Sequence, residues 1–247
     1  MPDSKRKLFT SDDFDKHINV GDELTFDKPF LKRLRVDLTW AGTDLDLCAF
    51  LVDKNSLMND RADLVYYGSK LRWKPARAFD DPNFDALEGA FSTWPAEGFK
   101  NPNRWMEATL PISDDGSVIG SWDDIGDEND EKTDANGNPL RGEQMHILLD
   151  NVDVRKHKAI IIAAAVAKAR IALGETFADA HNPILSISNE DTNEEIVSYA
   201  LASQFPGKDA ICIARLEFDD DSFLWTFVPT EDSFTGGMEY LARMVFN

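Results

Sequence analysis

The amino-acid sequence predicts an all-β protein, an antiparallel β-sandwich with short helical elements and an aromatic-rich insertion. The first observation is that apolar and polar residues alternate with a period of two through much of the chain. The second is that turn-forming residues separate these runs, which indicates eight or nine short strands. The third is the composition, because 43% hydrophobic and 29% charged residues in a chain of 247 are typical of a folded globular protein.

The expected strands differ in length. The clearest alternation runs through 33–40, 44–52, 210–218 and 223–228, and shorter strands are expected at 63–67, 144–149, 184–188 and 196–200. Segment 158–170 is ambiguous, because its alanines favour a helix and its three consecutive isoleucines favour a strand. Only the C-terminal GGMEYLARMV reads clearly as a helix, and Gly236 and Gly237 open it.

Residues 70–111 interrupt the alternation. They contain three tryptophans and four phenylalanines among Pro, Asp and Asn, and a disordered linker would not be so rich in aromatic residues. We therefore expect an ordered insertion that covers an open edge of the sandwich or contacts other proteins. The predicted domains are an N-terminal extension, 1–17, and one sandwich domain, 18–247.

The charge of the chain limits its partners. The 45 acidic residues outnumber the 26 basic ones and give a net charge of -19, which argues against binding to nucleic acid or to an anionic membrane surface. This balance suits divalent cations, basic partners or solubility. The sequence shows neither a secretory leader nor an apolar run long enough to span a membrane, and Cys48 and Cys212 lie in apolar stretches. We expect a soluble, cytoplasmic protein.

Acidic residues are concentrated in one loop. Segment 114–134 contains nine acids and a single base, Lys132. Carboxylates are the ligands that Ca²⁺ prefers, so this loop is a candidate calcium site, although its spacing is not that of an EF-hand. The alternative is a solvated acidic loop without a metal.

Asp44 and Asp46 form a second acidic feature. They lie two residues apart on a predicted strand, so both carboxylates are expected on one face, with Leu45 and Leu47 on the other. Acids on an apolar strand are costly unless they are paired or bind a metal. The alternative is that the strand frays here and that both acids are solvated.

Signatures of catalysis are absent from the sequence. It has no Gly-rich nucleotide-binding motif, no nucleophile elbow, no CxxC pair and no HxxxH spacing. Cys48 has no neighbouring base in the sequence and is expected to be a small buried residue. The protein is therefore predicted not to be an enzyme.

Several motifs resemble the TerD family of bacterial tellurium-resistance and general stress proteins. Trp40 followed by TDLDLCAF at 43–50 is similar to the family's tryptophan strand and its Phe-Asp-Leu-Asp-Ala-x-Ala-Phe signature. DLVYY at 63–67 resembles its Asp-x-Val-Phe-Tyr strand, and SDDGSVIGSWDD at 113–124 resembles its Ser-x-Asp-Gly-Ser-Val turn. Later motifs resemble ISNEDTNEEIVSYAL at 187–201, Trp225–Phe227 and Phe234–Gly237. Their order and spacing hold over roughly 18–68 and 113–247.

The resemblance implies a β-sandwich that binds Ca²⁺ between acidic loops and has no established catalytic activity. Carried over residue by residue, it implies ligands at Asp44, Asp46, Asp123, Asp124, Asp130 and Glu131. A second alignment makes Glu143, rather than Glu131, the matching glutamate. The sequence departs from the family where Trp122 replaces a glycine before the loop aspartate, which would reshape a tight turn.

Three functional hypotheses follow. The first is a TerD-like calcium-binding stress or tellurite-resistance protein that acts as a non-catalytic, metal-responsive interaction module. The second is a structural or assembly subunit of a larger, phage-related complex with a degenerate metal site, in which 70–111 contacts other proteins or further copies of the chain. The third, an enzyme acting on tellurite or another oxyanion, is the weakest, because such anions would avoid a protein of charge -19.

Overall fold

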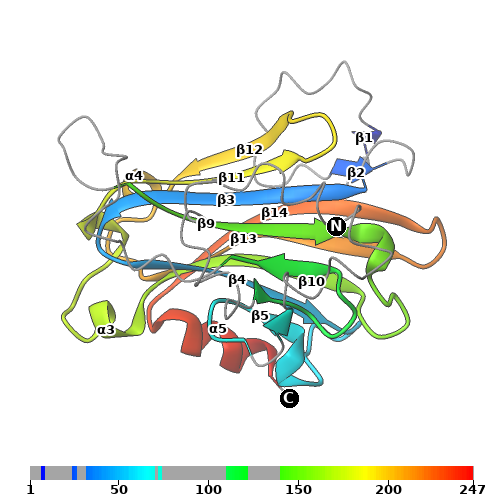
Figure 1. Ribbon diagram of the computed structural model, residues 1–247, viewed down its shortest axis with the longest axis horizontal. Helices are drawn as coiled ribbons and strands as arrows, with labels where there is room; N and C mark the ends of the chain where they lie inside the picture. The colour runs from blue at the N-terminus through cyan, green and yellow to red at the C-terminus, as the bar shows by residue number, and fades with distance from the viewer. Residues whose placement is uncertain are drawn as a thin grey trace, which may run out of the picture.

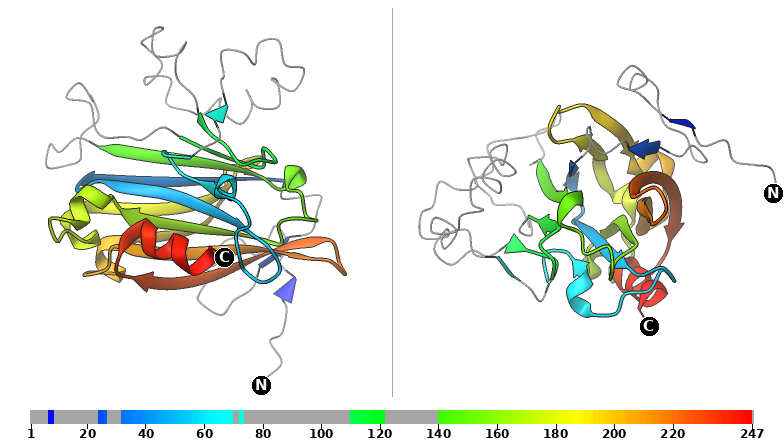
Figure 2. Two further views of the ribbon diagram at one scale, coloured as in Figure 1. Left: turned by 90° about the horizontal axis from the view of Figure 1, so that it is seen from below. Right: turned by 90° about the vertical axis from the view of Figure 1, so that its right-hand side faces the viewer.

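The computed structural model describes residues 32–69, 110–121 and 140–246, together with the backbone of the short strands Lys7–Leu8, Leu24–Phe26 and Arg72–Trp73. In this part of the chain two sheets pack face to face as a β-sandwich (Figures 1 and 2), which confirms the predicted fold class. All strand pairs are antiparallel except that of the two N-terminal strands.

The first sheet, sheet A, has seven strands in the order β1-β2-β14-β13-β10-β4-β5. These are β1 (Lys7–Leu8), β2 (Leu24–Phe26), β14 (Leu224–Phe234), β13 (Ala210–Asp219), β10 (Ala159–Val166), β4 (Leu45–Val52) and β5 (Leu64–Val65). The second, sheet B, has the order β12-β11-β3-β9-β8. Its strands are β12 (Glu195–Ala200), β11 (Ala180–Asn189), β3 (Arg33–Gly42), β9 (Arg141–Leu148) and β8 (Val118–Gly120).

In the described residues the helices are few and short. They are α3 (Lys168–Ile171), α4 (Leu201–Gln204) and α5 (Gly237–Val245), with 3₁₀ turns η2 (Arg61–Asp63), η4 (Leu149–Asn151) and η5 (Phe177–Asp179). The predicted C-terminal helix is therefore confirmed, and it begins after Gly236, whose φ of 116° lies in the left-handed region that favours glycine. No helix in the described ranges is both long and apolar enough to span a membrane.

The main core fills the space between the sheets. Because successive strand residues point to opposite faces, every second residue of β3 enters it, namely Leu34, Val36, Leu38 and Trp40, all with no exposed surface. Residues of β9, β10, β11 and β13 meet them from both sides. This alternation is the feature by which the longer strands were recognised in the sequence.

Sheet A is also covered on its outer face, where helix α5 packs (Figures 1 and 2). Cys48 and Phe50 of β4 and Ala163 of β10 lie beneath Leu241 and Val245 of the helix. Strands β4 and β10 are consequently buried at every position. The ambiguous segment 158–170 resolves into β10 followed by α3. Ile160 and Ile162 fill the inter-sheet core, and small residues on the other face, such as Ala163 and Ala165, leave room for α5.

The aromatic-rich insertion leaves and rejoins the fold at one point. Strand β6 (Arg72–Trp73) pairs with β7 (Leu110–Pro111), so Trp73 stands directly opposite Leu110. Residues 74–109 lie outside the described residues, as does the N-terminal extension 1–17 apart from the backbone of β1. The order and contacts expected for the insertion therefore stay predictions.

Candidate functional site

The two aspartates singled out in the sequence lie at the beginning of β4. Asp46 is on the strand and is only 4% exposed, and alternation puts it on the face that also carries Cys48 and Phe50. Asp44 precedes the strand, and its Oδ1 accepts a hydrogen bond from Arg141 Nη1 of β9 at 3.3 Å. The strand thus begins after Asp44, which is partly exposed and paired with Arg141, whereas Asp46 is buried, so the alternative that both acids are solvated is wrong for Asp46.

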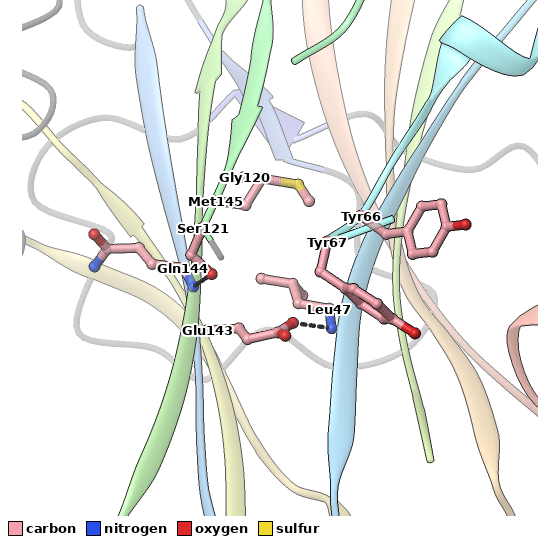
Figure 3. A pocket seen from close by; sticks show the side chains of 8 residues that line it. All are labelled: Leu47, Tyr66, Tyr67, Gly120, Ser121, Glu143, Gln144 and Met145. Atoms are coloured by element: carbon pink, nitrogen blue, oxygen red, sulfur yellow. Dashed lines mark hydrogen bonds between the residues drawn. The ribbon is translucent and has the colours of Figure 1, made fainter. Parts of the chain in front are cut away.

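Glu143 approaches the same stretch of chain from the other sheet. Its Oε2 accepts the N–H of Leu47 at 2.6 Å, and the residue is 4% exposed. Strand β5 pairs only with Ala49 and Phe50, so the carboxylate reaches β4 just beyond the point where this pairing stops. Figure 3 shows this bond between the two sheets, beside a shallow hollow lined by Tyr66, Tyr67, Ser121 and Met145 among others. Glu143 thus contacts the backbone of β4 at Leu47, from the face of the strand opposite to the Asp46 side chain.

Most of the acidic loop lies in segment 122–139, here called the acidic segment, and the described residues on both sides of it, Ser121 and Leu140, lie near Glu143. Ser121 exchanges two hydrogen bonds with Gln144: its N–H donates to the Gln144 carbonyl at 2.8 Å, and its Oγ accepts the Gln144 N–H at 3.1 Å. The described chain resumes at Leu140, next to Arg141. Asp123, Asp124, Asp130 and Glu131 lie between these anchors and outside the described residues, so only the ends of their segment are placed.

The described residues alone do not form a metal cage. Within them, no three His, Cys, Asp or Glu side chains are grouped so that they could hold a metal ion. The acids placed along this stretch, Asp44, Asp46 and Glu143, are carboxylates, whose chemistry suits a hard cation such as Ca²⁺, but Asp46 is on the outer face of sheet A and Glu143 contacts β4 from between the sheets. The guanidinium of Arg141 already supplies a positive charge at Asp44. In chemistry the described donors therefore fit calcium, and the further ligands that it requires would have to come from elsewhere.

A buried histidine cluster was not anticipated from the sequence. His157 is 1% exposed and stands between two carboxylates, with Nε2 at 3.0 Å from Asp63 Oδ1 and Nδ1 at 3.2 Å from Asp115 Oδ2. Asp63 comes from η2, Asp115 from the turn before β8, and His157 from the turn before β10. No local motif joins these residues, because the fold alone brings them together.

The cluster has strong electrostatic coupling. Burial by itself would lower the pKa of His157, but its bonds to Asp115 and Asp63 outweigh burial and raise that pKa to about 9. Burial likewise opposes ionisation of Asp115, yet hydrogen bonds from His157, Ser117 and the Asp153 N–H hold its pKa well below the ordinary value. The imidazolium and its two carboxylates therefore join three segments that are distant in the sequence, and their role is structural.

A second buried pair lies on sheet B. His146 Nδ1 is 2.9 Å from Glu190 Oε1, and both side chains are at least nine-tenths buried. His146 is on β9, and Glu190 is in the turn between β11 and β12, where its N–H also donates to the Arg33 carbonyl at 3.0 Å. The pair connects this turn to β9, two strands away from β11 in the sheet.

The cysteines have the properties of structural residues. In the sheet register Ala163 pairs with Cys48 on one side and with Cys212 on the other, so the cysteines are two strand spacings apart, about 10 Å. A disulfide requires a much shorter Cα separation. Burial raises the pKa of Cys48 well above its ordinary value and that of Cys212 to about 11. Reactive thiols are exposed and have lowered pKa values, so these two do not suit the reduction of an oxyanion.

Comparison with known proteins agrees with this architecture. A homologue of telluride resistance protein (TerD) from Streptomyces coelicolor A3(2) has a similar structure, with a TM-score of 0.52 and 16% identity over 86% of this chain and 95% of that chain. At this identity the likeness concerns the fold alone. No curated protein matches the chain. Residues 113–244, just over half of the chain, match the family model of the TerD domain, which confirms the resemblance seen in the motifs. The chain therefore belongs to the TerD domain family.

Proposed function

We propose that this TerD-family protein binds Ca²⁺ and acts as a non-catalytic, metal-responsive interaction module in stress or tellurite resistance. One observation supports the proposal: β9 carries the partner of Asp44 (Arg141), the carboxylate that contacts β4 (Glu143) and the partner of Ser121 (Gln144), so both described ends of the acidic segment lie beside the start of β4. Asp46 and Glu143 are each 4% exposed, and buried carboxylates are stable only with hydrogen bonds or a nearby positive charge.

The further ligands would come from the acidic segment. Segment 122–139 leaves the described chain after Ser121 and rejoins it three residues before Glu143. We therefore propose Asp123, Asp124 and Asp130 as ligands together with Asp44 and Asp46. Glu131, or Glu143, which contacts β4 at Leu47, would be the matching glutamate.

Calorimetric titration of the chelator-treated protein tests the proposal. A loose, multi-carboxylate site predicts a Kd of roughly 10⁻⁷–10⁻⁵ M for Ca²⁺ and weaker binding of Mg²⁺, which requires near-octahedral geometry. Asp46→Asn and Asp123→Asn should each weaken binding about tenfold or more. Asp219→Asn is the matched control, because Asp219 ends β13 near Lys158, at the opposite end of sheet A from Asp46. If the titration gives no heat and ~1 mM Ca²⁺ does not shift the melting temperature, calcium binding is refuted.

A second candidate is a structural or assembly subunit with a degenerate metal site. The ion pair between Arg141 and Asp44 favours it, because this pair already places a positive charge at one proposed ligand. In this alternative residues 70–111 provide contacts with partner proteins. Calcium titration separates the two candidates, since only the first predicts binding in the micromolar range.

A further inference from the structure

We propose that helix α5 is the surface through which two copies of this chain form a symmetric dimer. The two helices pack antiparallel by their exposed sides, so that each copy contributes the same residues to the contact. The inference is independent of calcium binding, because the residues it uses belong to the described helix and lie outside the acidic segment.

Helix α5 exposes large apolar side chains on the side that faces away from the sandwich. Leu241 and Val245 pack onto sheet A. Tyr240, Met244 and Phe246, by contrast, are 43%, 50% and 41% exposed, and no described helix or strand lies over them (Figures 1 and 2). Among the described residues they are three of the seven large apolar side chains that are exposed to this degree. Their concentration on one short helix marks a contact surface, whereas singly scattered apolar residues need no explanation.

Two stripes of side chains run along the exposed side of α5. Residues four apart share one side of a helix, so Tyr240 and Met244 form an apolar stripe, and Glu239 and Arg243 form a charged one. The stripes are offset by one residue and therefore lie next to each other, about 100° apart around the helix axis. The charged stripe has its acid near the beginning of the helix and its base near the end.

This pattern is self-complementary in an antiparallel pair. A two-fold axis that lies in the contact plane at right angles to α5 reverses the second helix but keeps like stripes opposite each other. Tyr240 of each copy then meets Met244 of the other, which is a favourable contact between sulfur and an aromatic ring. Glu239 of each copy likewise meets Arg243 of the other. A parallel pair would instead set the apolar stripe against the charged one.

The distribution of charge favours a second copy as the occupant of this face. The chain carries a net charge of -19, so two copies repel each other when acidic surfaces meet. Helix α5 differs from the chain as a whole, because its one acid, Glu239, is balanced by Arg243 and is also paired with Lys168 of the adjoining helix α3. Two copies can therefore approach here without that repulsion, and opposite charges meet across the axis.

Sedimentation equilibrium of the full chain tests the dimer. We expect a reversible equilibrium between monomer and dimer with a Kd of roughly 10⁻⁶–10⁻⁵ M, as for a small interface. Met244→Gln keeps the length of the side chain and should weaken dimerisation about tenfold or more. Phe223→Ser is the matched control, because Phe223 is 61% exposed but lies in the turn between β13 and β14, and its Kd should be unchanged. Melting temperatures show that the variants are folded.

Charge reversal tests the antiparallel pairing. Glu239→Arg gives each helix two bases and Arg243→Glu gives each helix two acids, so either variant alone should dimerise about tenfold more weakly. An equimolar mixture of the two should form heterodimers about as tightly as the unmodified protein forms its dimer, because every acid again meets a base. Two weakened variants whose mixture does not recover would overturn the antiparallel pairing.

Two other results would overturn the dimer itself. One is a chain that stays monomeric up to about 100 µM, well above the expected Kd, including one that captures a different protein through α5. The other is a dimer whose Kd is the same in Met244→Gln and in both charge variants, because its contact would then lie elsewhere.

Discussion

Replacing His157 with glutamine tests the buried cluster that joins three segments of the chain. The imidazolium donates to Asp63 and Asp115, and the His157 and Asp63 side chains are 2% and 3% exposed. Glutamine fills a similar volume and forms hydrogen bonds, but it carries no charge. The variant therefore leaves two buried carboxylates without their shared cation, and breaking a buried pair in this way is strongly destabilising.

The magnitude follows from the pKa of His157. A rise from 6.5 to about 9 corresponds to about 3 kcal/mol of stabilisation when the side chain is protonated in both the folded and the unfolded protein. Because the folded-state pKa is the higher one, this contribution is complete below pH 6.5 and is lost as the pH rises through 9. By linkage the contribution falls from about 3 kcal/mol at pH 6 to about 1 kcal/mol at pH 8.

Urea denaturation followed by tryptophan fluorescence measures the effect between pH 6 and 8.5. In this range Asp115, whose pKa is lowered, stays ionised and supplies its full contribution, and the raised pKa values of the thiols lie above it. The unmodified protein should lose stability steadily from pH 6.5 upward, whereas His157→Gln should show a flatter profile. His181→Gln, at an exposed histidine, is the control. The reasoning fails if the His157 variant is as stable as the original at pH 6, or if both profiles have the same slope.

Three further predictions concern the packing around the sandwich. Asp209→Ala should lower the free energy of unfolding by about 1–2 kcal/mol in urea titrations. The reason is that Asp209 Oδ1 accepts the first N–H of helix α5, that of Gly237, at 2.9 Å. An unchanged urea midpoint would contradict this capping role. The Gly237→Ala variant should have a lower melting temperature than Gly207→Ala. Both glycines have positive φ, but a Cβ on Gly237 would lie 2.4 Å from Ile171 Cδ1, whereas a Cβ on Gly207 would meet open space. Equal melting temperatures would argue against the clash. Replacing 74–109 with a short Gly/Ser loop should leave the melting temperature nearly unchanged, because the pairing of β6 with β7 holds the two ends of the insertion together. The same variant should no longer pull down partner proteins. A variant that keeps every partner would refute the contact role.

The sequence predicts several of the longer strands well, most plainly β3, in which buried and partly exposed residues alternate. The expected strand 33–40 corresponds to β3, and 210–218 corresponds to β13 almost residue for residue. Strand β14 extends to Phe234, well beyond the expected end at 228, because a shift in its register near Pro229 lets it keep pairing with β13. The short strands β7 and β8 were missed, since two or three residues are too few to show a period.

The candidate site could be predicted only in part. Asp44 and Asp46 were found because two acids on an apolar strand require an explanation, and the structure gives Asp44 a partner in Arg141. That partner is 97 positions away in the sequence, and no periodicity connects the two. Glu143 was noted only as an alternative to Glu131, because its contact with Leu47 depends on how the sheets face each other. Interactions between sheets are thus the part that pattern reasoning cannot supply.

The burial of β4 and β10 on both faces has a consequence for how the molecule opens. Every residue of these adjoining strands is buried, so their amide hydrogens should exchange with solvent only when the whole domain unfolds. Asp46 belongs to this slowest-exchanging part, and Asp44 adjoins it. A cation held there would be tied to the global transition rather than to the breathing of a surface loop. Its release would then affect the entire domain.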